Sequence, residues 1–181
     1  INGLHFKKIQ VPGFFSRCDL LINHPKLKTH CTTRITCGLK NMFGCLREKR
    51  KIRFHRFLDD AIVDANLAFK SDFVIVDANI CMEGLQGPTY GLPRRLGLLI
   101  GGKDIVSVDA FCAKVIGFRP SLVGHIRKAS AKGIGVMKYS LKGDLTPEEE
   151  KRYRLKFDRK LFYFMRVYSL LKRMRERVTR P

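Results

Sequence analysis

Side chains that bind anions, carry protons or hold metals are concentrated in residues 19–55. A short apolar run ends at Asn23, and three such side chains then follow at alternate positions: Lys26, Lys28 and His30. Alternate side chains of an extended segment share one face, so two ammonium groups and an imidazole would meet there. Such a group suits a phosphate or a carboxylate. The sequence therefore predicts a site for a small anionic ligand just after a strand, a common arrangement in α/β proteins.

Further along, Lys40, Asn41 and His55 extend this site. A lysine in such a place can act as a base, as a covalent anchor for a cofactor or as a phosphate ligand, and His55 is a candidate metal ligand or proton carrier. A helix is predicted over residues 33–43. A regular helix would separate His30 from Lys40 by roughly 15 Å along its axis, at about 1.5 Å per residue. We therefore expect the two residues to flank a ligand of nucleotide size without touching each other.

Glu83 is a second candidate, as an acid, a base or a ligand. It follows the continuous apolar run at residues 73–76, which is typical of a strand buried on both faces of a parallel sheet. The connection over residues 79–95 is rich in glycine and proline, and connections of that length are uncommon unless they are functional.

Alternating strands and helices position these residues, and this order indicates an α/β fold with a mainly parallel sheet and helices on both faces. The predicted strands cover residues 5–11, 20–22, 73–76 and 96–100. The predicted helices cover residues 33–43, 54–69, 105–116 and 120–131, and Asp104 is the expected cap of the third.

The chain divides into an α/β domain over residues 1–143 and a basic helical extension over residues 144–181. Thr146 and Pro147 are a strong helix start, and the helix is predicted to run to residue 178 with an apolar side. Residues 151–181 hold twelve Lys and Arg against two acidic residues. We expect this extension either to pack on its own domain or to bind nucleic acid or an anionic membrane surface.

The composition narrows the function classes. The 181 residues carry a formal net charge of +20, and a second basic block lies at residues 47–56. There is no apolar run long enough for a transmembrane helix. None of the six cysteines forms a C-x-x-C pair, which argues against a zinc ribbon or a ferredoxin-type cluster held by this chain alone. We expect reduced thiols, with Cys81 and Cys112 in the core, and a cytoplasmic protein that is either free or peripheral to the membrane.

Several ordered motifs resemble the domain of unknown function 362 family: LINHPKLKTHCTTRITCGLKNMFGC, IVDANICMEGLQGPTYGLP and GGKDIVSVDAFCAKVIG. The resemblance covers about residues 19–135. It implies that the chain is the carboxyl-terminal portion of a larger family domain, and that ferredoxin-like iron–sulfur proteins are candidate partners. A more distant similarity links His30, Lys40 and His55 to the amino-terminal domain of the nickel-pincer lactate racemases. There, a lysine tethers a nickel-pincer nucleotide and a later histidine binds nickel.

Three functions stay open at this point. The first is a metal-dependent enzyme, or a cofactor- or anion-binding domain, acting on a small carboxylate or phosphate-bearing ligand. In it His30, Lys40 and Glu83 are catalytic, His55 binds metal, and four residues bind a cofactor such as a metal or a nickel-pincer-like nucleotide: Lys26, Lys28, Lys40 and Asn41. The second is an accessory electron-transfer protein that works with iron–sulfur partners. The third is a protein that binds nucleic acid or anionic membranes through residues 151–181.

Overall fold

A five-stranded sheet lies at the centre of the fold, with β4 (Phe73–Glu83) as its middle strand. The computed structural model describes residues 1–48, 50–84, 91–145, 153–160, 162–164, 167–168 and 171, except for the side chain of Ile52. The other strands are β1 (Ile22–Asn23), β2 (Lys26–His30), β3 (Arg34–Thr36) and β5 (Leu92–Gly102). Strands β1 and β2 run parallel to β4, whereas β5 is antiparallel to β4 and β3 is antiparallel to β2. The predicted α/β class is therefore confirmed, with three strands running in one direction.

Strands β1 and β2 together behave as one interrupted strand along a single edge of β4. Ile22 is in register with Phe73, and Lys26 is in register with Asp77. Pro25 stands in the interruption, where its carbonyl oxygen accepts the Asp77 N–H at 2.9 Å. This arrangement carries the chain directly from the buried end of β1 into the lysines of β2.

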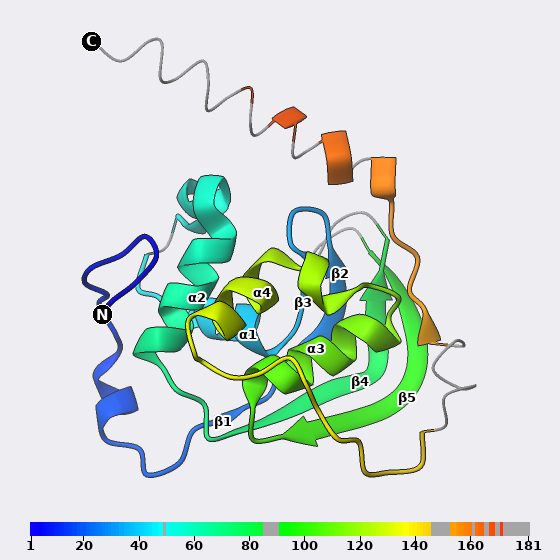
Figure 1. Cartoon of the computed structure of the whole chain (residues 1–181), viewed down its shortest axis with the longest axis horizontal. Helices are drawn as coiled ribbons and strands as arrows, with labels where there is room; N and C mark the ends of the chain where they lie inside the picture. The colour runs from blue at the N-terminus through cyan, green and yellow to red at the C-terminus, as the bar shows by residue number, and fades with distance from the viewer. Residues whose placement is uncertain are drawn as a thin grey trace.

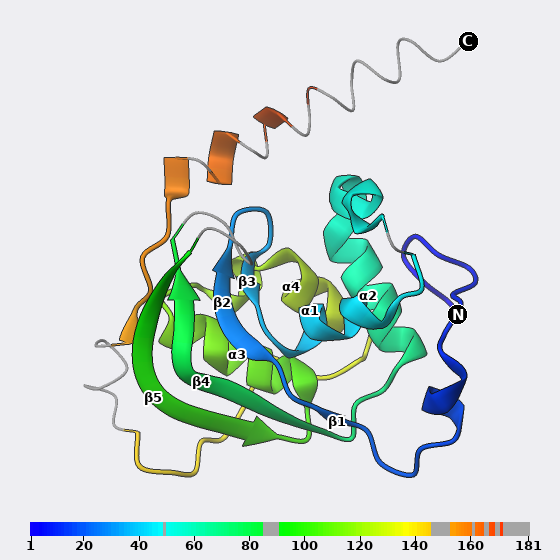
Figure 2. The ribbon, with the colours of Figure 1, turned by 180° about the vertical axis from the view of Figure 1, so that it is seen from behind.

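The helices gather on one face of the sheet, as the front and back views show (Figures 1 and 2). They are α1 (Gly38–Met42), α2 (Leu58–Ala68), α3 (Ile105–Val115) and α4 (Gly124–Ala131), together with the 3-10 helices η1 (Gly13–Ser16), η2 (Phe43–Cys45), η3 (Lys51–Phe57) and η4 (Pro120–Leu122). The core lies between them and the sheet, where Val74 and Val76 of β4 are fully buried. On the opposite face Leu99 is 74% exposed, so the expected cover of helices on both faces is not seen among the described residues.

Strand β5 is an antiparallel neighbour of β4 in a sheet that was predicted to be mainly parallel. The two strands extend well beyond the predicted apolar runs, so that only residues 84–91 connect them. A parallel pair needs a crossover of about a dozen residues or more, whereas a short connection joins antiparallel neighbours. Most of the connection predicted over residues 79–95 therefore belongs to the two strands, and its residues 85–90 lie outside the described part of the chain.

Residues 5–11 do not form the predicted strand. The buried carboxylate of Asp64 in α2 accepts the N–H groups of Leu4, His5 and Phe6 at 2.5, 2.8 and 2.7 Å. These donors face one side chain instead of a neighbouring strand. The N-terminal segment is thus an ordered loop fixed to α2.

The helix predicted over residues 33–43 is also wrong in its first half. Residues 34–36 form β3, and only residues 38–42 form the short helix α1. Ile35 and Thr36 are β-branched residues that fit a pleated strand better than a helix. Farther along, the predicted helix 54–69 is divided between η3 and α2, whereas α3 matches the predicted helix 105–116 and Asp104 caps it as expected.

The described part of the C-terminal extension includes a non-helical segment within the range predicted to be a helix. Residues 154–158 are non-helical. The Leu155 N–H donates to the Ile116 carbonyl at 3.3 Å, and the Gly84 N–H donates to the Lys156 carbonyl at 2.9 Å. Residues 159–160, 162–164, 167–168 and 171 are helical, while the predicted start at residues 146–150 lies outside the described part.

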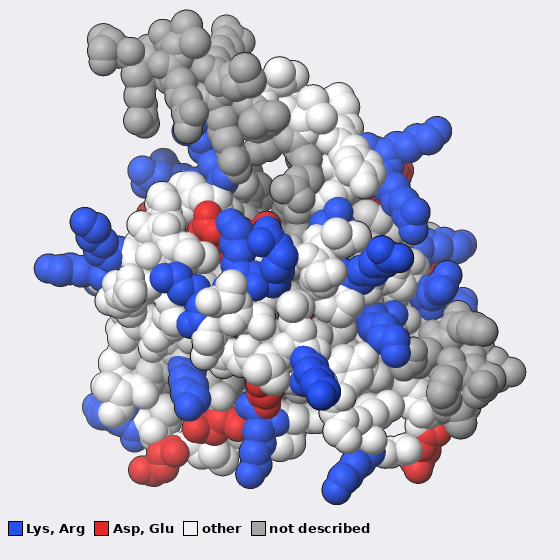
Figure 3. Space-filling view, viewed as in Figure 1, with Lys and Arg blue, Asp and Glu red and all other residues white. Residues whose placement is uncertain are grey.

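Lys and Arg side chains outnumber Asp and Glu over the face seen in Figure 3. None of the helices in the described part of the chain has the length and apolar character needed to cross a membrane.

Candidate functional site

The β2–β3 hairpin turns the chain back on itself and so decides the geometry of the site. Lys28 is in register with Thr36, and His30 is in register with Arg34, across a turn at residues 31–33. Arg34 has a φ of 67°, a left-handed conformation that non-glycine residues adopt rarely. Because the chain reverses here, α1 starts beside the strand that carries His30. The separation expected from a regular helix does not apply.

Helix α1 is held by buried polar side chains from three other elements. Asp109 of α3 accepts the N–H groups of Gly38 and Leu39 at 2.8 and 3.0 Å. Asn23 of β1 donates to the Gly38 carbonyl at 3.0 Å, and Asn66 of α2 donates to the Leu39 carbonyl at 2.8 Å. A five-residue helix is not stable alone, so these contacts fix the residue that follows, Lys40.

Gly38 permits this close approach. A Cβ at this position would lie 2.9 Å from the Asp109 carboxylate and 3.0 Å from Ile105. Burial raises the pKa of Asp109 to about 6, although the charge of His125 and the hydrogen bonds from α1 act in the opposite direction. Burial thus disfavours the charged form of Asp109. Its carboxylate nevertheless has a structural role there, because it caps the helix that carries Lys40.

Lys40 is half-buried and its ammonium is destabilised. Burial is the largest cause and the charge of Lys28 the next, and together they lower the pKa of Lys40 to about 8; Cys31 opposes the shift and Lys51 adds to it. At pH 7 about a tenth of the Lys40 side chains would then carry a neutral amine, compared with well under a thousandth for an unperturbed lysine.

His30 is buried and is held neutral by the same surroundings. Burial first, and then the charges of Lys40, His55, His125 and Lys28, lower the pKa of His30 to about 3. The Thr32 N–H lies 3.3 Å from Nδ1 of His30, and the Thr32 hydroxyl lies 3.1 Å from the same atom. If Nδ1 accepts from the backbone, the proton of the neutral ring sits on Nε2.

His55 and His125 complete the group. Partial burial and the charge of Lys40 lower the pKa of His55. His125 of α4 is fully buried, its Nδ1 lies 3.3 Å from an Asp59 carboxylate oxygen, and no hydrogen-bond partner for its Nε2 is found in the described part of the protein. His125 was not among the residues predicted for the site. The available signal was its place beside Ile126 on the apolar side of the predicted helix 120–131.

Charge interactions thus link four of the predicted site residues: Lys28, His30, Lys40 and His55. The other three have separate contacts. Lys26 forms an ion pair with Asp77, which lowers the pKa of that carboxyl group. Asn41 donates to Asn23 at 2.8 Å.

Glu83 is buried at the end of β4 and accepts the Lys156 N–H at 2.9 Å, so it holds the C-terminal segment against the sheet. This contact gives the carboxylate a structural partner. Its predicted catalytic role remains a prediction.

The described residues do not fit a metal centre with several protein ligands. No group of three or more His, Cys, Asp or Glu side chains comes together in the part of the chain that the structure describes. All six cysteines are free thiols, and Cys37, Cys81 and Cys112 are buried, as was expected for the last two. Burial raises the pKa of Cys81 to about 12, which keeps it a protonated thiol and a poor ligand.

Comparison with known proteins gives a family but no activity. The sequence model of the family described as "Domain of unknown function (DUF362)" matches residues 1–114. A thylakoid-associated protein of Synechocystis sp. is 34% identical over 113 residues, which cover 58% of this chain and 35% of the relative. The chain therefore spans about a third of the length of that relative. No solved structure matches the chain.

Proposed function

The chain belongs to the domain of unknown function 362 family, and from the chemistry of its site we propose that it binds a small carbonyl compound bearing a carboxylate or phosphate and attacks it with the amine of Lys40. One observation carries this proposal. A lysine whose pKa is lowered to about 8 lies within electrostatic reach of a histidine whose pKa is lowered to about 3. Desolvation beside another cation is a known way to turn a lysine into a nucleophile.

Each residue of the group has a distinct role in this proposal. Lys28 attracts the anionic group of the ligand. The negative charge of that group then offsets part of the repulsion between the ammonium groups of Lys28 and Lys40. The neutral amine of Lys40 bonds to the carbonyl carbon, and the carbonyl oxygen leaves as water with both amine protons, giving an imine. Neutral His30 donates a hydrogen bond from Nε2–H to the carbonyl oxygen, a role that enzymes can give to a neutral imidazole. His55 carries protons at the outer side.

Reductive trapping tests this function. The protein is incubated with pyruvate, with glyoxylate or with glyceraldehyde 3-phosphate in the presence of cyanoborohydride, and the adduct is located by peptide mass spectrometry. We expect one adduct per chain, on Lys40, and a rate that rises between pH 7 and pH 8 as the amine is deprotonated. The three probes separate a carboxylate ligand from a phosphate-bearing one.

Two variants serve as controls. Lys40→Arg should abolish the adduct. Lys103→Arg changes an exposed lysine outside the site and should leave the adduct unchanged. An adduct spread evenly over surface lysines, or one that persists in the Lys40→Arg variant, would contradict the proposal.

A second candidate function is association with an anionic membrane surface through residues 151–181. It is supported by the twelve Lys and Arg of that segment and by the thylakoid association named for the relative. Co-sedimentation with phosphatidylglycerol vesicles, with and without residues 151–181, tests it. Equal binding of both forms would contradict a membrane role for this segment.

A further inference from the structure

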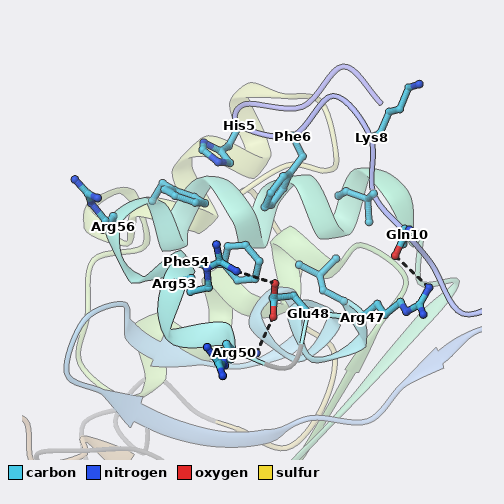
Figure 4. Close-up of a pocket in the computed structure, with 13 residues that line it drawn as sticks. His5, Phe6, Lys8, Gln10, Arg47, Glu48, Arg50, Arg53, Phe54 and Arg56 are labelled. Atoms are coloured by element: carbon cyan, nitrogen blue, oxygen red, sulfur yellow. Dashed lines mark hydrogen bonds and ion pairs between the residues drawn. The ribbon is translucent and has the colours of Figure 1, made fainter. Parts of the chain in front are cut away.

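A groove with a volume of about 940 Å³ lies between the N-terminal loop and residues 46–57 (Figure 4). Neither Lys40 nor His30 lines it. Its lining is strongly basic. One carboxylate, that of Glu48, stands among five cationic side chains: Lys8, Arg47, Arg50, Arg53 and Arg56. This excess of positive charge is local, so it does not depend on the C-terminal extension.

The arginines of one wall are spaced by the geometry of η3. A 3-10 helix has three residues per turn, so side chains three positions apart stand above one another. The Arg53 N–H donates to the Arg50 carbonyl at 3.1 Å, which is the i to i+3 bond of such a helix. Arg53 and Arg56 therefore lie one turn apart on η3, about 6 Å at a rise of about 2.0 Å per residue. Arg50 is the N-cap residue, three positions before Arg53. We call these three residues the arginine row.

The spacing of the arginine row suits a strand of nucleic acid. Successive phosphates of an extended nucleic-acid strand are separated by a comparable distance, and each carries one negative charge. Seven residues are long for a 3-10 helix, since runs beyond three or four are uncommon. An ordinary α-helix would turn residues three positions apart progressively away from one line.

Aromatic rings form the other part of the groove. The exposed ring of His5 stacks on Phe57 with ring centroids 3.5 Å apart and planes 18° from parallel. Phe6 meets Phe54 edge to face at 5.4 Å. The loop that carries His5 and Phe6 is fixed by the buried carboxylate of Asp64, so the rings are held in place before any ligand binds.

Glu48 organises the arginine row and partly neutralises it. One of its oxygens accepts the Arg50 N–H at 2.9 Å, and the other lies 3.6 Å from the Arg53 guanidinium, whose side chain is 70% exposed (Figure 4). Across the groove, Arg47 donates to Gln10 at 3.3 Å and joins the two walls. An exposed ion pair of this kind contributes little to stability, so a phosphate can displace it.

We infer that this groove binds a single strand of nucleic acid, with successive phosphates on the arginine row and one base stacked on the outer face of His5. A positively charged groove beside aromatic rings is how proteins bind single strands without reading their sequence. A bilayer is a poorer fit, because it needs an outward apolar surface, whereas Phe54 and Phe57 pack against other rings. The inference is independent of the function proposed for Lys40.

Binding of a fluorescent oligodeoxythymidylate by the full chain, followed by anisotropy as salt is raised, tests the arginine row. The variant R50A/R53A/R56A is compared with K70A/K103A/R127A, which removes three exposed cations outside the groove. Loss of three phosphate contacts should lower the log–log salt slope by about 2, at about 0.7 per contact for single strands. The groove variant should also bind at least about tenfold more weakly, and the matched variant should keep its slope.

His5→Ala tests the stacking step without altering the cations. Removal of the ring should weaken binding by about tenfold, leave the salt slope unchanged, and abolish the fluorescence quenching of a 2-aminopurine base in the strand. This variant also decides the matter if the triple arginine variant fails to fold. Equal losses in the two triple variants, an unaffected His5→Ala variant, or binding to phosphatidylglycerol vesicles without binding to the oligonucleotide would each overturn the inference.

Discussion

Replacement of Lys40 by methionine should make the protein more stable at neutral pH. Lys40→Met keeps an unbranched side chain but removes the ammonium that burial and Lys28 disfavour. If Lys40 serves the chemistry of the site, its buried charge lowers the stability of the folded protein. Functional residues often reduce stability in this way.

The size and sign of this effect follow from the pKa of Lys40. The pKa is lowered from 10.5 to about 8, so the unfolded chain binds more protons than the folded protein between these values, and stability rises with pH in that window. Below pH 8 the full cost applies, about 3 kcal/mol at about 1.4 kcal/mol per pKa unit. At pH 9.5 the cost should fall to between about 1 and 2 kcal/mol, and it vanishes above pH 10.5.

Urea unfolding of the wild-type protein and of Lys40→Met at pH 7 and pH 9.5 measures this difference. Lys103→Met changes an exposed lysine and should stay within about 0.5 kcal/mol of the wild type at both pH values. If Lys40→Met is no more stable than the wild type at pH 7, the charge of Lys40 does not destabilise the fold. The same conclusion follows if the gain in the free energy of unfolding is equal at both pH values, because a change in packing alone would not depend on pH.

Three further changes test the contacts around this residue. Lys28→Gln should raise the pKa of Lys40, because the charge of Lys28 lowers it. The pKa of Lys40 is measured from the pH dependence of its acetylation, followed by mass spectrometry. An unchanged pKa would show that Lys28 is not part of the site. Lys26→Ala should leave the pKa of Lys40 unchanged and cost at most about 1 kcal/mol in urea unfolding, since its partner Asp77 is near the surface; a larger loss would mean that the ion pair is structural. Asp109→Ala should cost about 2–6 kcal/mol by leaving two buried N–H groups of α1 without an acceptor. Because the pKa of Asp109 is raised above 3.8 to about 6, the wild type should gain stability from this group as pH falls from 6 to 4, and the variant should lack that gain.

The candidate site residues could be selected from the sequence, whereas their arrangement could not. The alternation of Lys26, Lys28 and His30 would place them on one face if the segment were extended, and residues 26–30 do form β2, with a register shift between Lys26 and Lys28. The position of Lys40 was not predictable in the same way. It depends on the turn at residues 31–33 and on hydrogen bonds from Asn23, Asn66 and Asp109, which lie far apart in the sequence.

The remaining misses have the same physical origin. Residues 5–11 resemble a strand by local alternation, but a single carboxylate distant in sequence, Asp64, takes their N–H groups. Likewise, the apolar run of β5 predicts a buried strand, but its antiparallel direction depends on the length of its connection to β4. In each case a tertiary contact overrides a correct local preference.

The two basic features of this protein should respond differently to salt. The charges around His30 and Lys40 interact in a desolvated place, where dissolved ions screen them weakly. The arginine row is exposed to solvent at Arg53, so its attraction for phosphates is screened within about 10 Å at about 0.1 M salt. Raising salt from about 0.05 to 0.5 M should therefore release an oligonucleotide while the pKa of Lys40 stays near 8. If both change together, then a single diffuse field, and not two separate sites, accounts for the behaviour of this chain.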